Sequence, residues 1–403
     1  MNGFVKNLIS YFRFKMYTHL KNTSFLFVVN TLDGFGGAER QALLLASYIK
    51  ANVSKHVAFI AFHEGVTRTY KCILEKEGFE VYYFPFNHHA SKLKKLRQYF
   101  KLVQFVKKLS PDVLLPYVAE SNKIVAQIWK YTGAKFAFWN QREEGRKLYG
   151  TALEQKLIRG VSAIVSNSFE GADALKRTYG LSDKDITVIN NGIISYKHEF
   201  IKTDWHHKLG IETNRPIISM IANITNRKDH ETLLKAWAIV ILDCKENNVE
   251  LPFLILAGRK AETYDKLRLL AFDLNLSNHI AFVGELNPVQ DLISQSYFCV
   301  FSSNLEGCPN GVLECMEQGK VVIGTNISGV VQALGNKYNS QCLSEPNNAE
   351  DLANKILEIY KQPKLILEIG EYNSTRIKTR FSVEQMVNKH LNLLKNCLKL
   401  NIL

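Results

Sequence analysis

The sequence predicts an α/β fold made of two doubly wound domains. Short apolar segments rich in Val, Ile and Phe alternate with segments whose apolar residues recur at helical spacing, and this series occurs twice. Such alternation indicates parallel sheets covered by helices on both faces. The chain has 403 residues, enough for two domains that each bury a core of their own.

The first series defines a domain at residues 24–195, after a basic segment at residues 1–23. A glycine-rich loop, residues 33–37, follows its first strand, and a helix is predicted over residues 38–50. The predicted strands of this domain are Phe25–Asn30, Val57–Phe62, Val81–Phe84, Val113–Leu115, Phe136–Trp139, Ala163–Ser166 and Thr187–Ile189.

The second series defines a domain at residues 196–384. The polar stretch Ser195–Arg215 is predicted to link the domains, and the last helix, with residues 385–403, is expected to pack back toward the first. Two such domains would face a central cleft where ligands bind. The predicted strands are Ile217–Ala222, Phe253–Ala257, Ile280–Val283, Cys299–Ser302 and Val321–Gly324.

Composition excludes several classes of protein. Hydrophobic residues make up 46% and charged residues 22%, which is not the composition of a disordered or collagen-like chain. The seven cysteines form no CxxC pair, so zinc-site spacing is absent and a reducing, cytoplasmic compartment is favoured. Asp183 and Asp185 form an Asp-x-Asp pattern, but a solvated turn explains it better, and no metal is expected.

The whole formal net charge of +13 falls on residues 1–200. Residues 1–23 carry no acid, and within them Met16 is an alternative to Met1 as the start of translation. The segment Ser91–Leu109 reads as a basic amphipathic helix of the kind that lies on anionic membranes. The apolar residues of this helix are expected in the core of the first domain: Leu93, Leu96, Phe100, Val103 and Val106. No nucleic-acid-binding module is visible in the sequence.

The most informative segment is residues 305–319. Pro309 suits the first turn of a helix and Gly319 its carboxyl cap, so Glu306 precedes the helix and Glu314 lies about one and a half turns inside. Two carboxylates beside the first amides of a helix can clamp a polyol. The alternative is a helix with two solvated glutamates. The amides in question belong to Asn310, Gly311 and Val312.

Glu306 and Glu314, with seven residues between them, resemble the signature of retaining glycosyltransferases of family four, which have the GT-B fold. The resemblance extends from about Phe25 to the final helix. The other matching segments are Gly36–Arg40, Val188–Ile193, Ile221–His230, Leu256–Arg259 and Phe282–Gly284.

The resemblance implies a metal-independent transfer from a nucleoside diphosphate sugar, which we expect to be a UDP-sugar, bound by the second domain. Glu306 would contact the transferred sugar, Glu314 the ribose and Lys228 the diphosphate. The acceptor, a hydroxyl of a lipid-linked glycan in surface polysaccharide synthesis, would bind the first domain at the inner face of the cell membrane. The remaining donor contacts are expected at Gly36, Gly37, Arg259, Gly284, Pro309, Asn310 and Gly311.

The residues support part of this assignment directly. A strand, a glycine pair and a helix in succession, as at Gly36 and Gly37, commonly cradle phosphate, although a plain tight turn has the same pattern. Glu39 stands where a dinucleotide fingerprint requires glycine, which excludes NAD. Lys228 can neutralise charge on a departing diphosphate.

Several positions depart from the family pattern. Asn223 stands where an arginine is usual, and Arg227, which can bind two phosphate oxygens at once, is the nearest substitute. Arg259 or Arg142 could supply that charge instead. Arg142 could also bind the acceptor, or form a surface salt bridge with Glu143 or Glu144.

Two further departures leave other functions open. Tyr117 stands near the place of an acceptor-side histidine, and Gln332 stands in place of a late glutamate. The alternatives are a sugar-nucleotide epimerase, which also uses two such domains, and a donor-binding scaffold without catalysis. The sequence gives no indication of oligomeric state.

Overall fold

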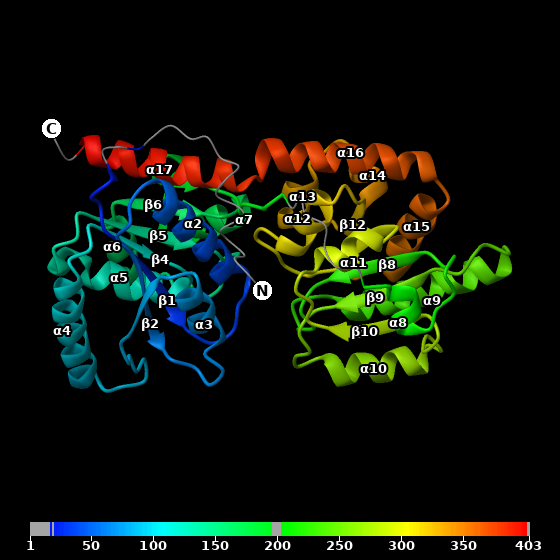
Figure 1. Cartoon of the computed structure of the whole chain (residues 1–403), viewed down its shortest axis with the longest axis horizontal. Coiled ribbons are helices and arrows are strands. Elements are labelled where there is room, and N and C mark those ends of the chain that lie inside the picture. Colours follow the sequence, from blue (N-terminus) through cyan, green and yellow to red (C-terminus); the bar gives the residue numbers. More distant parts are fainter. Residues whose placement is uncertain (1–16, 18–19, 196–202, 401–403) are drawn as a thin grey trace. The chain divides into compact units, whose positions relative to one another are not determined.

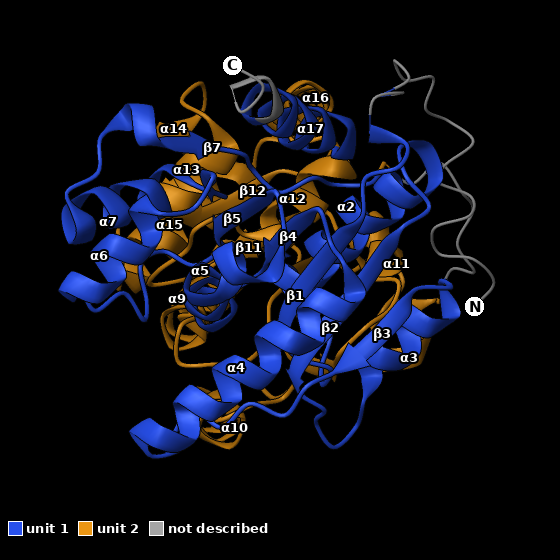
Figure 2. Ribbon diagram, turned by 90° about the vertical axis from the view of Figure 1, so that its left-hand side faces the viewer, with its two compact units in different colours: residues 1–194, 383–403 blue, residues 195–382 orange. Residues whose placement is uncertain are grey.

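The computed structural model describes residues 17, 20–195 and 203–400, with side chains up to residue 397. Most of the predicted basic segment at residues 1–23, including Met16, lies outside the described residues. The chain divides into two compact units, residues 1–194 with 383–403, and residues 195–382 (Figure 2). The boundaries expected from the sequence were 195/196 and 384/385.

The first unit is built on a seven-stranded parallel sheet in the order β3-β2-β1-β4-β5-β6-β7. Its order reverses beside β1, which is typical of doubly wound folds. The strands are β1 Phe25–Thr31, β2 Val57–His63, β3 Glu80–Tyr83, β4 Val113–Pro116, β5 Phe136–Gln141, β6 Ala163–Ser166 and β7 Ile186–Val188.

Helices cover both faces of this sheet (Figure 1). The last of them, α17, belongs to the first unit although it follows the second in sequence, and it contacts α2. The helices are α2 Gly37–Asn52, α3 Thr69–Lys76, α4 Lys92–Leu109, α5 Ala119–Thr132, α6 Ala152–Arg159, α7 Phe169–Tyr179 and α17 Val383–Leu400.

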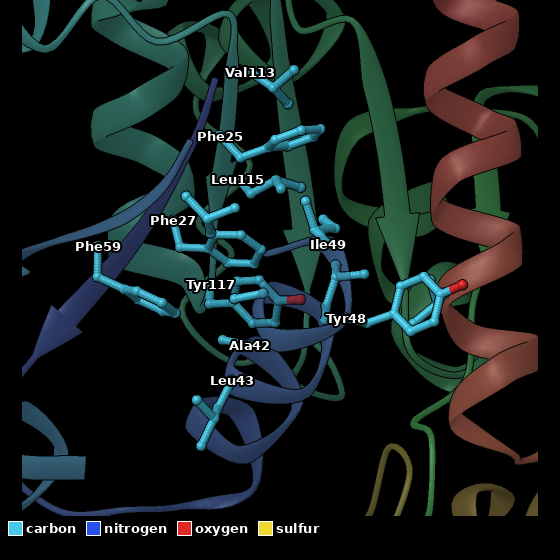
Figure 3. Packing of buried hydrophobic residues seen from close by; sticks show 14 of the residues in the cluster. Phe25, Phe27, Ala42, Leu43, Tyr48, Ile49, Phe59, Val113, Leu115 and Tyr117 are labelled. Carbon is cyan, nitrogen blue, oxygen red and sulfur yellow. The ribbon is translucent and has the colours of Figure 1, made fainter. Parts of the chain in front are cut away.

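The alternation of side chains along β1 builds two cores. Phe25, Phe27 and Val29 point to the face covered by α2 and α17, where Phe27 stacks on Phe59 with ring centroids 5.1 Å apart (Figure 3). Leu26 and Val28 point to the opposite face and join the core beneath α4 and α5. Both faces of the sheet are therefore buried, as the continuous apolar strands predict.

The second unit repeats the plan with a six-stranded parallel sheet in the order β10-β9-β8-β11-β12-β13. Its strands are β8 Ile217–Ile221, β9 Phe253–Ala257, β10 Ile280–Gly284, β11 Phe298–Phe301, β12 Val322–Thr325 and β13 Leu343–Ser344. Its helices are α8 Trp205–Leu209, α9 His230–Glu246, α10 Tyr264–Asp273, α11 Gln290–Gln295, α12 Asn310–Glu317, α13 Ser328–Leu334, α14 Asn339–Cys342, α15 Ala349–Tyr360 and α16 Pro363–Arg380.

The α/β fold with two doubly wound units is confirmed, but the predicted linker is wrong over much of its length. Residues 205–209 form α8, and Trp205 is buried in the core of the second unit. Arg215 donates to the carbonyl oxygens of Leu251 and Pro252. One apolar anchor in a polar stretch gives no periodic signal, so the sequence pattern could not show this.

The predicted orientation of α4 is also wrong at its amino-terminal half. Leu93, Leu96 and Phe100 were expected in the core, but 75%, 67% and 65% of their surfaces are exposed. Val106 is buried as expected, and Leu102, which was not predicted in the core, is buried with it. Within the described residues, no helix is long and apolar enough to cross a membrane.

Candidate active site

The loops that follow β8 and β9 are tied together at the carboxyl edge of the second sheet. Asn223 Oδ1 accepts a hydrogen bond from the backbone N–H of Arg259 at 3.0 Å. A Cβ at Gly258 would lie 2.0 Å from the carbonyl oxygen of Ala222, so only glycine permits this approach. Asn223, which replaces an expected arginine, therefore acts here as a tie between two loops.

Lys228 and Glu306 meet at the centre of this edge. The Lys228 ammonium donates to Glu306 Oε1, and the two side chains are only 17% and 13% exposed. Ser303, two residues after β11, donates to the same carboxylate oxygen at 2.7 Å. Lys228 also lies over the ring of Phe301, 4.5 Å from its centroid. Two predicted site residues separated by 78 positions are thus in direct contact.

Helix α12 begins immediately beyond this contact. Pro309 is the N-cap residue with extended backbone, not part of the first turn as predicted, and the helix starts at Asn310. Gly311 packs so close to β8 that an added Cβ would lie 2.2 Å from the carbonyl oxygen of Ile221. Gly319 has φ +67° and ends the helix as predicted. Glu314 is 5% exposed, which argues against two solvated glutamates.

The predicted cations Arg227 and Arg259 both act on the carboxylate of Glu262, a residue that was not predicted from the sequence. The backbone amides of Glu262 and Asn226 lower the pKa of Glu262, and the charges of Arg227 and Arg259 lower it further. Both arginines are exposed. The structure therefore brings the two candidate phosphate-binding arginines to one side of the site.

The start of α9 supports the position of Lys228. Asp229 is the N-cap, as predicted, and its Oδ1 accepts from the backbone N–H of Thr232 at 3.1 Å. Ser302 Oγ donates to the carbonyl oxygen of Asp229 at 2.7 Å. His230 is buried, and burial lowers its pKa to about 4, so it is neutral near pH 7.

Sequence reasoning missed Ser303 and Gly329, which hold the Glu306 loop. Ser303 Oγ also lies 3.0 Å from the carbonyl oxygen of Arg227, which joins the loops on either side of the ion pair. A Cβ at Gly329 would lie 2.3 Å from the carbonyl oxygen of Glu306. The sequence signal that could have revealed Gly329 is a glycine in the first turn of a predicted helix, α13. Gly284, another predicted donor contact, ends β10 with φ +78° and accepts from Gly258 N–H at 2.8 Å.

The glycine loop of the first unit leads directly into α2, as the sequence predicts. Gly36 is the N-cap of α2 and Gly37 its first residue. The carboxylate of Glu39 accepts hydrogen bonds from the backbone amides of Gly36 and of Glu39 itself, and burial raises its pKa. The Glu39 carboxylate thus accepts a hydrogen bond from a backbone amide of the loop that was predicted to bind phosphate. Phosphate binding by Gly36 and Gly37 stays a prediction.

Arg142 is buried within the first unit. It donates to Asn191 Oδ1 at 2.6 Å and lies over the ring of Tyr117, 5.3 Å from its centroid. Only 8% of its surface is exposed, so a surface salt bridge with Glu143 or Glu144 is not its environment. Its predicted contact with an acceptor remains a prediction.

The Asp-x-Asp pattern is engaged in local structure. Asp185 accepts from the backbone and hydroxyl of Ser182, and Asp183 pairs with Lys176 at 2.8 Å. Across the described part of the chain, no three or more His, Cys, Asp or Glu side chains are grouped so that they could hold a metal ion.

Two family models match, one to each unit. Residues 35–195 match the model described as Glycosyltransferase Family 4, and residues 201–376 match Glycosyl transferases group 1. An uncharacterized glycosyltransferase of Haemophilus influenzae is 23% identical over 371 residues, which cover 90% of this chain and 97% of that protein. A Campylobacter jejuni enzyme named N,N'-diacetylbacillosaminyl-diphospho-undecaprenol alpha-1,3-N-acetylgalactosaminyltransferase is 22% identical, covering 75% of this chain and 82% of that protein.

Solved glycosyltransferase structures share the fold. A glycosyltransferase of Rickettsia africae superposes with a TM-score of 0.77 at 24% identity, covering 94% of this chain and 99% of that one. HepE of Anabaena, in complex with UDP and glucose, superposes with a TM-score of 0.74 at 18% identity, covering 93% of this chain and all of that one. The chain is therefore a GT-B glycosyltransferase of the family 4 type.

Proposed function

We propose that this enzyme is a retaining, metal-independent glycosyltransferase that moves a sugar from a UDP-sugar to a hydroxyl of a lipid-linked glycan. The observation that carries the proposal is the contact of Lys228 with Glu306 beside the start of α12. This contact places an ammonium group that can bind the diphosphate next to a carboxylate that can bind sugar hydroxyls. Binding of a nucleoside diphosphate sugar requires both kinds of group.

Each residue of the site would have a distinct role toward the donor. Lys228 would stabilise negative charge as the bond between sugar and diphosphate breaks, assisted by Arg227 or Arg259. Glu306 would accept hydrogen bonds from hydroxyls of the transferred sugar, and Glu314 from the ribose diol. The choice of a UDP-sugar is supported by HepE, whose solved complexes contain UDP and UDP-glucose.

The lipid-linked acceptor is supported by a relative and by α4. The Campylobacter jejuni relative is named for transfer onto a sugar carried by diphospho-undecaprenol. On α4, Leu93, Leu96 and Phe100 form one exposed apolar stripe, and the helix contains no acidic residue. The bordering cations are Lys94, Arg97, Lys101 and Lys108. An apolar stripe flanked by cations is typical of helices that lie in an anionic membrane surface.

A donor panel tests the proposal. Thermal unfolding is measured with UDP-, GDP- and dTDP-sugars, because a ligand at 100 times its Kd stabilises the fold by about 2.7 kcal/mol. The best donor is then incubated with a synthetic prenyl-diphosphate-linked sugar. Transfer supports the proposal. Donor conversion without acceptor would indicate the epimerase, and binding without any product would indicate the scaffold.

A further inference from the structure

On the proposed function, the ion pair between Lys228 and Glu306 must open when a donor binds. The Lys228 ammonium is needed at the diphosphate and the Glu306 carboxylate at the sugar, yet in this structure each engages the other. A lysine side chain is flexible and can turn from a carboxylate to a diphosphate. Glu306 then loses one of the donors that hold it, so its position depends on another donor, the hydroxyl of Ser303.

Ser303 is anchored independently of this ion pair. Its side chain is fully buried just beyond the end of β11. Its backbone N–H donates to Oγ1 of Thr325, the last residue of β12, at 3.0 Å. The backbone N–H of the next residue, Asn304, donates to the carbonyl oxygen of Arg227 at 3.0 Å. Two strands and the loop after β8 therefore fix the Ser303 hydroxyl, and a turn of the Lys228 side chain does not move it.

The single hydroxyl hydrogen of Ser303 has two acceptors within reach. Glu306 Oε1 lies 2.7 Å from Ser303 Oγ, and the carbonyl oxygen of Arg227 lies 3.0 Å from it. A hydroxyl donates one hydrogen, so only one of these contacts is strong at a time. The carboxylate is the stronger acceptor because it is charged, and the Arg227 carbonyl already accepts from Asn304. The hydrogen therefore belongs to Glu306, with or without Lys228 beside it.

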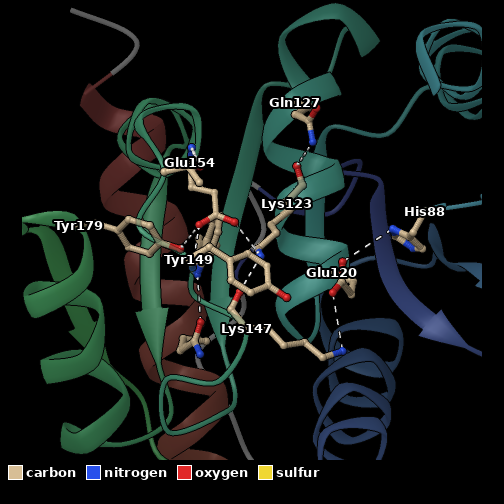
Figure 4. Close-up of polar contacts among 11 residues, drawn as sticks. His88, Glu120, Lys123, Gln127, Lys147, Tyr149, Glu154 and Tyr179 are labelled. Carbon is tan, nitrogen blue, oxygen red and sulfur yellow. Dashed lines mark hydrogen bonds and ion pairs between the residues drawn. The ribbon is translucent and has the colours of Figure 1, made fainter. Parts of the chain in front are cut away.

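A second buried lysine–glutamate pair, in the first unit, has a different arrangement of donors. Lys123 and Glu154 are 12% and 10% exposed, close to the 17% and 13% of the donor-site pair. Lys123 binds Glu154 Oε1 at 2.7 Å, while the Tyr179 hydroxyl donates to Oε2 at 3.0 Å (Figure 4). In the donor site the lysine and the serine instead share Oε1 of Glu306. The Glu306 carboxylate therefore keeps a donor on the same oxygen when the lysine leaves.

We propose that Ser303 is a positioning residue that holds the Glu306 carboxylate for the transferred sugar once Lys228 has turned to the diphosphate. The inference rests on the proposed function, because it explains how one ion pair can supply both contacts with the donor. Ser303 is fully buried, so it acts through Glu306 and not on the donor itself. Without its hydroxyl, Glu306 would lose both donors on Oε1 as Lys228 leaves, so the ion pair would be harder to separate.

The test is a double-mutant cycle on the full chain with Ser303→Ala, Glu306→Gln and the double variant. Isothermal titration gives the Kd of UDP, and the transfer assay with the prenyl-diphosphate-linked sugar gives kcat. Ser303→Cys is a further variant, which keeps a weaker donor at this position. Tyr179→Phe is the matched control, because it removes a hydroxyl from a lysine–glutamate pair of similar burial in the first unit.

Ser303→Ala should raise the Kd of UDP about three- to tenfold and lower kcat about tenfold or more. In the Glu306→Gln background the same substitution should change the Kd less than about twofold, since a charge no longer holds Lys228. Ser303→Cys should lie between Ser303→Ala and the wild type. Tyr179→Phe should leave both the Kd and kcat unchanged, although it also removes a buried hydrogen bond.

Wild-type values of Kd and kcat in Ser303→Ala would overturn the inference. An equal loss of UDP affinity with and without the Glu306 carboxylate would also overturn it, because Ser303 would then act independently of Glu306. An equal loss in Tyr179→Phe would show a general effect of removing a buried hydroxyl, which contradicts a specific role of Ser303. If the wild type itself binds no UDP, the proposed function is refuted instead.

Discussion

Replacing Glu306 with glutamine should strengthen the binding of UDP while it abolishes transfer. Lys228 donates to Glu306 in a site where both side chains are less than one-fifth exposed, so their attraction is only partly screened. UDP must compete with this carboxylate for the ammonium. Glutamine keeps the shape of the side chain and the Ser303 contact at that position, but removes the competing charge.

The magnitude follows from the exposure of the pair. A hydrogen bond between charged groups contributes about 1.5–3 kcal/mol, and residual solvent contact reduces the net gain to about 1–2 kcal/mol. The Kd of UDP should therefore fall by about five- to thirtyfold. Transfer should fall by about 100-fold or more, because Glu306 is proposed to bind the transferred sugar.

Isothermal titration of UDP measures the first effect, and product formation measures the second. Glu368→Gln is the control, since it breaks a different contact with a lysine, Lys337, on the exposed face of α16. This control should leave both quantities unchanged. Unchanged or weaker UDP binding by Glu306→Gln would show that the carboxylate does not compete with the diphosphate, and the assignment of Lys228 would be refuted.

Four further outcomes are expected. Lys228→Ala and Arg227→Ala should each lower kcat by about 100-fold if both side chains stabilise the charge that develops on the diphosphate. If only Lys228→Ala lowers kcat, the second cation is Arg259, and Arg259→Ala should then lower kcat. The enzyme should sediment with anionic liposomes and be released by salt or by reversing Lys94, Lys95, Lys107 and Lys108 to Glu, and equal sedimentation with neutral vesicles would contradict this. Burial lowers the pKa of three histidines from 6.5 to about 4, namely His230, His279 and His390. Between these pH values the unfolded chain binds more protons than the folded chain, so the stabilisation is complete above pH 6.5 and is lost as the pH falls toward 4. The Tm should therefore decrease over this range, and a constant Tm would contradict the prediction. Gly329→Ala should lower kcat by about tenfold or more, because its Cβ would collide with the Glu306 carbonyl oxygen, whereas Ser328→Ala should not; normal turnover in both would show that the loop can shift harmlessly.

Local patterns were sufficient to predict the fold. Buried parallel strands are continuous apolar runs, so every predicted strand lies within one or two residues of its observed bounds, but the two-residue strand β13 was not predicted. Residues Glu306 and Glu314 stand out because they flank a helix start with recognisable end signals. Position Asp229 was predictable for the same reason, since capping depends on immediate neighbours.

The errors have a different origin. Helix α4 carries apolar residues on two stripes, and periodicity cannot tell which stripe faces the core; Leu102 and Val106 face it, while Leu93 and Phe100 do not. Contacts between distant segments were equally invisible. His88 and Glu120 are 32 positions apart and unremarkable in sequence, and only the sheet order brings them together.

The anomeric configuration of the product tests the central claim most directly. The enzyme is incubated with an α-linked UDP-sugar and its acceptor, with and without EDTA, and the new glycosidic bond is assigned by its one-bond and vicinal proton couplings in NMR. We predict an α-linked product formed at the same rate in EDTA. A β-linked product, or a reaction that stops when divalent cations are removed, would contradict a retaining, metal-independent transfer.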